Sequence, residues 1–330
     1  DCGQLPSQTG CEYIAMNPKL KQSIDDFIQH EALSGTSLIM TVFGDCIFHR
    51  GGIISLASLI QLMDVFGLNE RSVRTAVFRL VQNGWLVSEK IGRTSYYRIT
   101  ENSRQRFIIA DQKIYSFQHK EWDQKWDLVL LSSVELDNKA ILKKELEWLG
   151  FANIATNVMA YPGCDHLKLQ NLLLNLQMTD QVVIFKAETL QLWQESYPTI
   201  KRMVATNWPV PELHQRYEKF MGDFREFLNL VDAEDELDTV QAFQIRILLI
   251  HQYRRILLKD PNLPFELLPS DWLSLNARNL SSNLYQRVVS AGEEFFMELA
   301  RTSEGSMPPA HPQFFKRFGG IKIEEPSSLA

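Results

Sequence analysis

The segment NERSVRTAVFRLVQNGWL, residues 69–86, constrains the fold of this chain more than any other stretch. Asn69 is suited to cap the start of a helix, and Gly84 is suited to end it in the left-handed conformation. Between them, apolar side chains recur every three or four residues, which predicts one buried helix face. The members of this face are Val73, Ala76, Val77, Leu80 and Val81. Such a helix needs a core to pack against.

The opposite side of the same helix is polar and cationic. It carries Arg71, Ser72, Arg74, Thr75, Arg79 and Gln82. Side chains of this length and type contact base edges and phosphates in a major groove of DNA. The alternative is a solvated face whose arginines pair with nearby acids, because charged exposed faces are the norm on surface helices.

The segments before this helix predict two more helices. Residues 36–52 show a helical apolar pattern that ends at Gly51-Gly52. A second helix follows over residues 55–67, with Ser55 as its cap. The connection from there to the arginine-bearing helix is very short, which is typical of a helix-turn-helix.

The segment after the helix predicts a basic hairpin. Residues 86–90 and 95–99 are typical of two short strands around a turn at Gly92 and Arg93, and a helix follows over 100–115. Three helices, a hairpin and another helix predict a winged helix-turn-helix. We expect Lys90 and Arg93 of the hairpin to contact phosphates or an adjacent minor groove.

The charge distribution favours DNA over the solvated alternative. Residues 71–106 hold eight Lys or Arg and two Asp or Glu, a net charge of +6, whereas the whole chain carries −6. The rest of the chain therefore carries −12. A basic island in an acidic protein is typical of a local nucleic-acid surface.

Length and composition predict a globular protein. The 330 residues are 45% hydrophobic and 22% charged, with room for two or three domains. No apolar run approaches a membrane span, and no signal-peptide pattern opens the chain. The four cysteines lack CxxC spacing, and Cys46 lies in an apolar helix, which indicates a reduced, cytoplasmic protein. Met16 resembles a natural start, so residues 1–15 are interpreted as an appended segment.

Residues 119–188 predict a small central domain. Strands over 126–132 and 181–187, both interpreted as buried, enclose a segment at 152–162 that forms one strand or two. The intervening helices cover 138–151 and, with Asp165 as cap, the stretch to Leu176. The core face predicted for the first of these helices consists of Ile141, Leu142, Leu146 and Leu149. This order favours a ferredoxin-like α+β domain.

The rest of the chain is predicted to be mainly helical. The expected helices cover 188–204, 211–230, 239–259 and 277–301. The predicted fold class is therefore α+β, with three domains. These are a winged helix-turn-helix domain over 16–118, the ferredoxin-like domain over 119–188, and a helical effector and dimerisation domain over 189–330.

Catalytic motifs do not support an enzyme. The sequence lacks GxGxxG, GxxxxGK[ST], GxSxG and HExxH. Cys164 and His166 form a C-x-H that would hold two metal ligands, but without a partner pair an ordinary helix-start loop is favoured. The alternative function is a metal-dependent nuclease on the central domain, which needs convergent carboxylates. Asp137 lies beyond the first strand in an apparent turn, so we predict no enzyme, metal or cofactor.

The helix from residue 243 carries an arginine within an apolar face. Phe243, Ile247, Ile250 and Leu257 share that face, and Arg254 falls in its middle. A buried arginine needs an anion, which is either a carboxylate of another helix or an anionic group of a bound effector. His251 and Tyr253 flank Arg254, and Arg246 is a further candidate contact with an effector.

Several stretches together resemble one family. They are HRGG (49–52), VRTAVFRL (73–80), GWL (84–86), GRTSYY (92–97), KIY (113–115), WLGF (148–151), HQYRRILLKDPNLPFELLPSDW (251–272), LYQRV (284–288) and FKRFGG (315–320). They are similar to the phenylacetic-acid catabolism repressors, the PaaX family. The resemblance extends from about residue 35 to residue 323.

The resemblance implies a homodimeric bacterial repressor with a winged-helix N-terminal domain. A protein of this kind represses phenylacetate-degradation genes and leaves its DNA when phenylacetyl-coenzyme A binds. The expected partners are a double-stranded operator with an inverted repeat, phenylacetyl-coenzyme A and a second copy of the chain. RSVRTAVFR, residues 71–79, matches the recognition helix of the family, whereas no family motif assigns the contacts with the effector.

Overall fold

The computed structural model describes residues 17–31, 33–116, 121–190, 193 and 196–323. These residues form two compact units, and residues 1–15, interpreted as an appended segment, lie outside the described residues. The first unit holds the described residues up to 111, with 223–251 and those from 280, and the second unit holds the described residues of 112–222 with 252–279. The boundaries fall within α5 (Glu101–Tyr115), α9 (Val210–Asp232), α10 (Thr239–Leu257) and α11 (Ser274–Leu299). The division into three domains remains a prediction.

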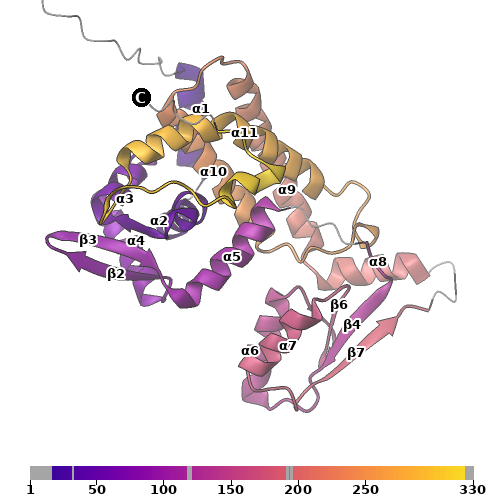
Figure 1. The fold of residues 1–330 in the computed structure, drawn as a ribbon. Coiled ribbons are helices and arrows are strands. Elements are labelled where there is room, and N and C mark those ends of the chain that lie inside the picture. The colour runs from indigo at the N-terminus through magenta and orange to yellow at the C-terminus, as the bar shows by residue number, and fades with distance from the viewer. Residues whose placement is uncertain (1–16, 32, 117–120, 191–192, 194–195, 324–330) are drawn as a thin grey trace, which may run out of the picture. The chain divides into compact units, whose positions relative to one another are not determined.

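The first unit contains the winged helix. Its elements before α5 are α1 (Pro18–His30), α2 (Gly35–Val42), a π-helix η1 (Phe43–Ile47), a 3-10 helix η2 (Phe48–Arg50), β1 (Ile53–Ser55), α3 (Leu56–Asp64), α4 (Glu70–Gln82), β2 (Leu86–Ile91) and β3 (Thr94–Ile99). Near the C-terminus follow β8 (Arg301–Thr302), β9 (Gly305–Ser306) and a 3-10 helix η4 (Phe314–Gly319). The three helices and the hairpin lie where the sequence predicts them (Figure 1).

The helix-turn-helix forms as the apolar spacing predicts. The side chain of Ser55 accepts a hydrogen bond from the backbone N–H of Ser58, and Asn69 accepts one from Ser72, so both helices are capped at their first turn. Helix α4 packs on α2 and α3. Val73 and Val77 are fully buried. The stripe on α4 thus supplies the core that holds the helix in place.

The wing is a three-stranded antiparallel sheet in the order β1-β3-β2. The sequence predicts β2 and β3 but not β1, whose residues Ile53 to Ser55 are all buried and pair with β3. This short strand closes the inner edge of the hairpin.

The second unit contains a four-stranded antiparallel sheet in the order β5-β6-β4-β7. Its elements are β4 (Lys125–Leu130), α6 (Leu136–Trp148), β5 (Ala152–Ala155), β6 (Val158–Tyr161), α7 (His166–Asn175) and β7 (Val183–Glu188). Helices α6 and α7 lie together on one face of the sheet (Figure 1). This order of elements is the predicted ferredoxin-like arrangement, with two short strands in residues 152–162.

Two burial predictions for this domain are wrong. Ile141 is 51% exposed, whereas Leu142 and Leu146 of the same helix are fully buried. The strand that includes Ile184 and Phe185 is exposed, not buried. The reason is its position, since β7 stands at the end of the strand order and pairs with β4 alone among the described strands. Composition predicts a strand here, but not the neighbours that would cover it.

The remaining helices differ little from expectation. Glu188 ends β7, so α8 (Ser196–Asn207) starts later than the predicted helix. A 3-10 helix, η3 (Phe265–Leu267), lies between α10 and α11. No helix in the described ranges is long and apolar enough to cross a bilayer.

Candidate nucleic-acid interface

Helix α4 presents the predicted contact residues to solvent. The side chains assigned to DNA on this helix, Arg71, Ser72, Arg74, Thr75 and Arg79, are all exposed. They lie opposite the stripe that packs into the unit. The burial of the apolar stripe fixes the rotation of α4 and therefore directs the arginines toward solvent.

The first turn of α4 positions one arginine. Nε and one terminal nitrogen of Arg74 lie 2.8 Å and 2.7 Å from Oε1 of Glu70, with both side chains more than half exposed. The alternative interpretation, arginines paired with nearby acids, therefore applies to Arg74. An exposed pair of this kind is weak, about 0.3–0.5 kcal/mol, so it orients the guanidinium without preventing a phosphate contact.

The hydroxyl of Thr75 is used inside the helix. It donates to the backbone oxygen of Arg71 at 2.9 Å. Thr75 therefore offers DNA an acceptor oxygen and a methyl group rather than a hydrogen-bond donor. Its role differs from that of the arginines beside it.

The wing carries its two predicted cations at the tip. Lys90 and Arg93 are exposed, and the turn between β2 and β3 consists of Gly92, at φ 62°, and Arg93. Further along the hairpin, the guanidinium of Arg98 donates two hydrogen bonds of 2.9 Å to Glu89. These hydrogen bonds lower the pKa of Glu89 and connect the two strands.

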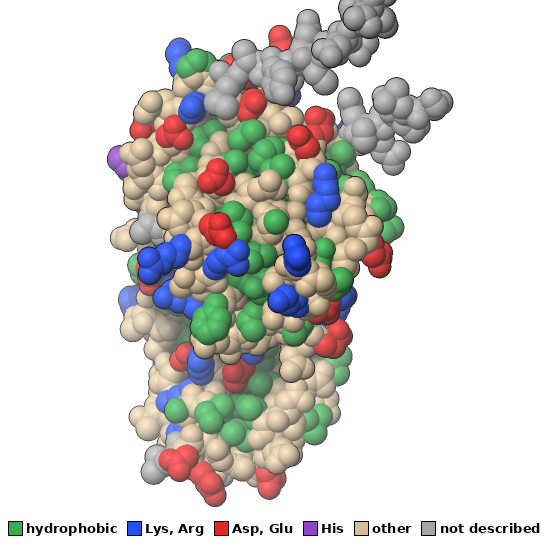
Figure 2. Space-filling model, turned by 90° about the vertical axis from the view of Figure 1, so that its left-hand side faces the viewer, with side chains coloured by type: hydrophobic (Ala, Val, Ile, Leu, Met, Phe, Trp, Pro, Cys, Tyr) green, Lys and Arg blue, Asp and Glu red, His purple; other side chains and the backbone are tan. Residues whose placement is uncertain are grey.

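Figure 2 shows a face of the molecule on which Lys and Arg side chains gather. This is the side that carries α4 and the wing in Figure 1. An open hollow of about 420 Å³ on α4 is lined by Glu70, Arg71, Arg74 and Thr75. The basic segment of the sequence, residues 71–106, therefore contributes cationic side chains to the surface of the protein.

Sequence reasoning missed one residue of this surface. Phe78 is 59% exposed, although its neighbour Val77 is fully buried. A helical projection would have found it, because Phe78 follows Arg71 by seven residues and so lies about 20° from it around the helix.

The four residues assigned to an effector all lie on α10, but they have different neighbours. The boundary between the two units falls within this helix, after His251. His251 is buried with its Nδ1 3.0 Å from the hydroxyl of Thr41. The ring of Tyr253, also buried, lies 5.5 Å from that of Phe220.

Arg246 has carboxylate partners. Its guanidinium is fully buried, with Nε 2.6 Å from Asp45 and one terminal nitrogen 2.7 Å from Glu293. Burial would lower the pKa of Arg246, but the charges of Asp45 and other neighbours raise it well above its ordinary value. The ordinary explanation of a buried arginine, a carboxylate on another element, applies here.

These contacts belong to a buried ion network in the first unit. Asp45 also accepts hydrogen bonds from the Tyr285 hydroxyl at 2.9 Å and from Arg317 at 3.2 Å. The guanidinium of Arg50 lies 2.6 Å from Glu293. Three of the quoted motifs, HRGG, LYQRV and FKRFGG, therefore contribute core residues: Arg50, Tyr285 and Arg317.

In the second unit, Arg254 lies near Tyr115 at the end of α5. Burial lowers the pKa of Arg254 to about 10, while Tyr115 acts in the opposite direction. Arg278 donates to the backbone oxygen of Tyr115 at 3.5 Å. Arginines of α10 and α11 therefore both lie near Tyr115. Lys113, also on α5, donates to the backbone oxygen of Asp260 at 2.7 Å, and burial lowers its pKa.

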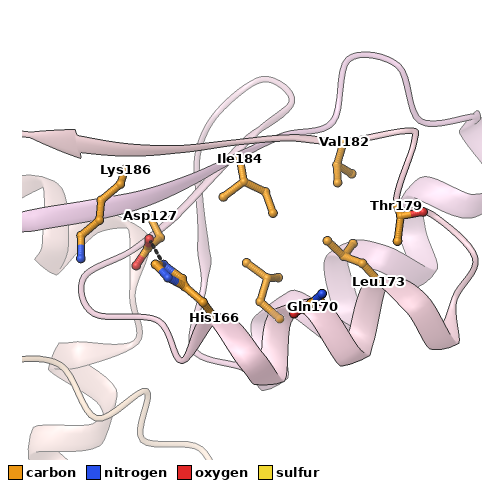
Figure 3. A pocket seen from close by; sticks show the side chains of 9 residues that line it. Asp127, His166, Gln170, Leu173, Thr179, Val182, Ile184 and Lys186 are labelled. Atoms are coloured by element: carbon orange, nitrogen blue, oxygen red, sulfur yellow. Dashed lines mark hydrogen bonds and ion pairs between the residues drawn. The ribbon is translucent and has the colours of Figure 1, made fainter.

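A cavity of about 410 Å³ lies between β7 and α7 (Figure 3). Leu169, Leu173 and Ile184 form much of its apolar wall. At one end, Nε2 of His166 lies 2.6 Å from the buried carboxylate of Asp127. Lys186 lies 2.8 Å from Asp123, so the charged groups of this cavity already have partners within the domain.

The C-x-H motif is part of the same arrangement. The other carboxylate oxygen of Asp127 accepts a hydrogen bond from the backbone N–H of Cys164 at 2.9 Å. Asp165 caps α7, as the sequence predicts. No three His, Cys, Asp or Glu side chains of the described segments are placed to hold a metal ion.

Helices α3 and α4 with the β2–β3 wing make this chain a winged helix-turn-helix DNA-binding protein. Models of one family match it as PaaX-like protein over residues 34–103, PaaX protein central Cas2-like domain over 119–197, and PaaX-like protein C-terminal domain over 208–298. The chain belongs to the PaaX family.

A curated relative, the Transcriptional repressor PaaX of Escherichia coli (strain K12), is 41% identical over 308 residues, which cover 92% of this chain and 96% of the relative. This similarity supports a transcription regulator and a non-enzyme. A solved structure, the uncharacterized protein Rv0674 from Mycobacterium tuberculosis, aligns at 19% identity with a TM-score of 0.46 over 84% of this chain and 98% of that chain.

Proposed function

We propose that this protein represses phenylacetate-degradation genes, binds its operator as a homodimer and leaves the operator when phenylacetyl-coenzyme A binds. The observation that carries the proposal is α4, whose apolar stripe is buried while its arginines are exposed. Similarity to a transcriptional repressor over 92% of the chain supports the same function. A repressor that binds operator DNA must be in the same compartment as that DNA. For a bacterial repressor this agrees with the predicted cytoplasmic location.

In this proposal, α4 lies in the major groove. Arg71 and Arg79 contact base edges, and Arg74 contacts base edges or phosphates from its pair with Glu70. Lys90 and Arg93 hold phosphates from the wing. Ser72 and Thr75 contribute acceptor oxygens beside them.

A homodimer fits both the target and the surface of the chain. A single winged helix contacts few base pairs, and two-fold symmetry doubles the contacts on an inverted repeat. Strand β7 offers a surface for a second copy, because Val183, Ile184 and Phe185 are 41–51% exposed at the edge of a sheet. An exposed apolar edge strand pairs readily with another chain. We assign the dimer contact to β7.

The effector contact is assigned to the region of Arg254 and Arg278, which both lie near Tyr115. Coenzyme A carries phosphates, which suit these two arginines, and its phenylacetyl group suits an apolar pocket. Tyr253 remains in the proposal through its ring. Arg246 and His251 are not carried forward, because Arg246 is held by Asp45 and Glu293 and His251 lies beside Thr41.

Arg254→Met tests the function and the site together. We expect this variant to bind promoter DNA of phenylacetate-degradation genes like the wild type but to need far more phenylacetyl-coenzyme A for release. An effector releases DNA only if it binds the DNA-free state more tightly. Free phenylacetate lacks the phosphates and should bind much more weakly in calorimetric titrations.

Three outcomes separate the parts of the proposal. Wild-type protein that does not bind the promoter DNA contradicts the operator assignment. Binding without release contradicts the effector. A stable Arg254→Met protein that releases DNA at wild-type effector concentrations removes Arg254 from the site.

A further inference from the structure

Phe78 is exposed at the centre of a cationic helix face. It is 59% exposed, and the residues one turn before it, Arg74 and Thr75, are exposed as well. Gln82, one turn after it, is also exposed. A phenylalanine that is mostly exposed on such a face contributes little to folding, since burial is what makes an aromatic ring stabilising.

The helix geometry places Phe78 among the groups that meet DNA. At 3.6 residues per turn, Phe78 lies about 20° around the helix from Arg71 and about 40° from Arg74. The buried stripe of Val73 and Val77 points the other way. Phe78 therefore lies between Arg71 and Arg74 around the helix, on the side that faces a duplex contacted by both arginines.

The major groove contains one apolar group that such a ring can contact. Each base pair presents hydrogen-bond donors and acceptors there, and only thymine adds a methyl group, at C5. The arginines beside Phe78 match the negative charge of the backbone, which favours DNA as the occupant of this apolar spot.

We propose that Phe78 is a specificity-determining residue that reads the C5 methyl group of a thymine in each operator half-site. This inference rests on the proposed function of α4. In this proposal, polar and apolar side chains of α4 recognise different groups of the operator. The arginines recognise acceptors of bases and phosphates, and Phe78 recognises a methyl group.

Replacing single thymines by deoxyuridine tests the contact, because deoxyuridine lacks only this methyl group. A duplex is first enriched from a randomised library with the full-length wild-type protein. Each of its thymines is then replaced in turn, and the affinities of wild type and Phe78→Ala are measured. We expect one thymine per half-site to weaken wild-type binding about fourfold when replaced, the value for one buried methyl group. Phe78→Ala should bind both duplexes equally.

Two further variants make the result specific. Phe78→Leu keeps an apolar contact and should keep part of the thymine preference. Phe315→Ala removes an aromatic ring that is 42% exposed on η4, outside α4, and should discriminate deoxyuridine like the wild type. Equal melting temperatures of Phe78→Ala and wild type show that the fold is unchanged.

Failure of this inference is distinguishable from failure of the proposed function. If the wild-type protein enriches no duplex, both are overturned. If a duplex is enriched but no thymine is sensitive to replacement, or if Phe78→Ala remains as sensitive as the wild type, α4 binds DNA and Phe78 does not read it.

Discussion

Two arginines of helix α10 have opposite energetic roles at the scale of single residues. Arg246 is fully buried between Asp45 and Glu293. Arg254 lies where burial lowers its pKa to about 10. In the folded state, burial disfavours the charged form of Arg254, and this lowers the free energy of unfolding. The loss of stability is fully present at neutral pH and becomes smaller as the pH rises through about 10. Arg246 therefore stabilises the folded state, whereas the buried charge of Arg254 destabilises it.

Arg246→Met should therefore destabilise the protein strongly. The substitution leaves the Asp45 carboxylate buried without its main partner, and breaking a buried pair costs about 3–5 kcal/mol. Urea denaturation of the full-length protein measures this loss. Arg254→Met is the matched variant, for which we expect an unchanged or higher unfolding free energy at pH 7. Equal losses in the two variants would contradict the distinction.

At the scale of elements, the proposed function gives α4 and the wing different parts of DNA binding. Helix α4 is held by a buried stripe, and its exposed arginines are proposed to distinguish bases. The wing has Arg93 in its two-residue turn and Lys90 near the end of β2, and both side chains are exposed. Base contacts determine specificity, whereas phosphate contacts add affinity for all sequences.

Replacing both wing cations should change the salt dependence and leave the sequence preference intact. Each phosphate contact contributes about 0.9 to the slope of log K against log salt. The Lys90→Gln, Arg93→Gln variant should lower that slope by about two and weaken all duplexes alike. The Lys19→Gln, Lys21→Gln variant is the control, since it removes the same charge from exposed positions of α1. A wing variant with the wild-type slope would remove the wing from the interface.

At the scale of the whole molecule, the proposed function requires two copies of the chain on one operator. The central sheet ends in β7, whose apolar side chains are exposed. In the proposed homodimer, two copies pair at this strand and each supplies one α4 helix to the inverted repeat.

Phe185→Asp should disrupt that assembly. A carboxylate at a position that is 49% exposed leaves the folded unit little changed, but it opposes apolar pairing with a second copy. In sedimentation, the wild type should form dimers and prefer a full palindrome over a half-site, whereas this variant should be monomeric and lose the preference. Ile141→Asp, at a position 51% exposed on α6, should remain dimeric. A dimeric Phe185→Asp protein would exclude β7 as the contact, and a monomeric wild type would exclude the homodimer.

The sequence by itself determined the parts that depend on local order. Caps, apolar spacing and turn glycines act within a few residues, and they predicted α4 and the strands β2 and β3 within one or two positions. They also predicted the start of α3, which ends at Asp64, three residues before the predicted end. The same reasoning correctly gave the ferredoxin-like order of the second unit and placed the contact arginines on an exposed face.

Only the tertiary structure decided which side chains are covered and which charges meet. Asp45 contacts Arg246 and Arg317, which lie 201 and 272 residues further along the chain. The buried stripe of α6 excluded Ile141, and the exposure of β7 depended on which strand stands at the sheet edge. A side chain is buried only if another segment packs against it, and that segment is often distant in the sequence. Periodicity within one element therefore does not specify which side chains are buried.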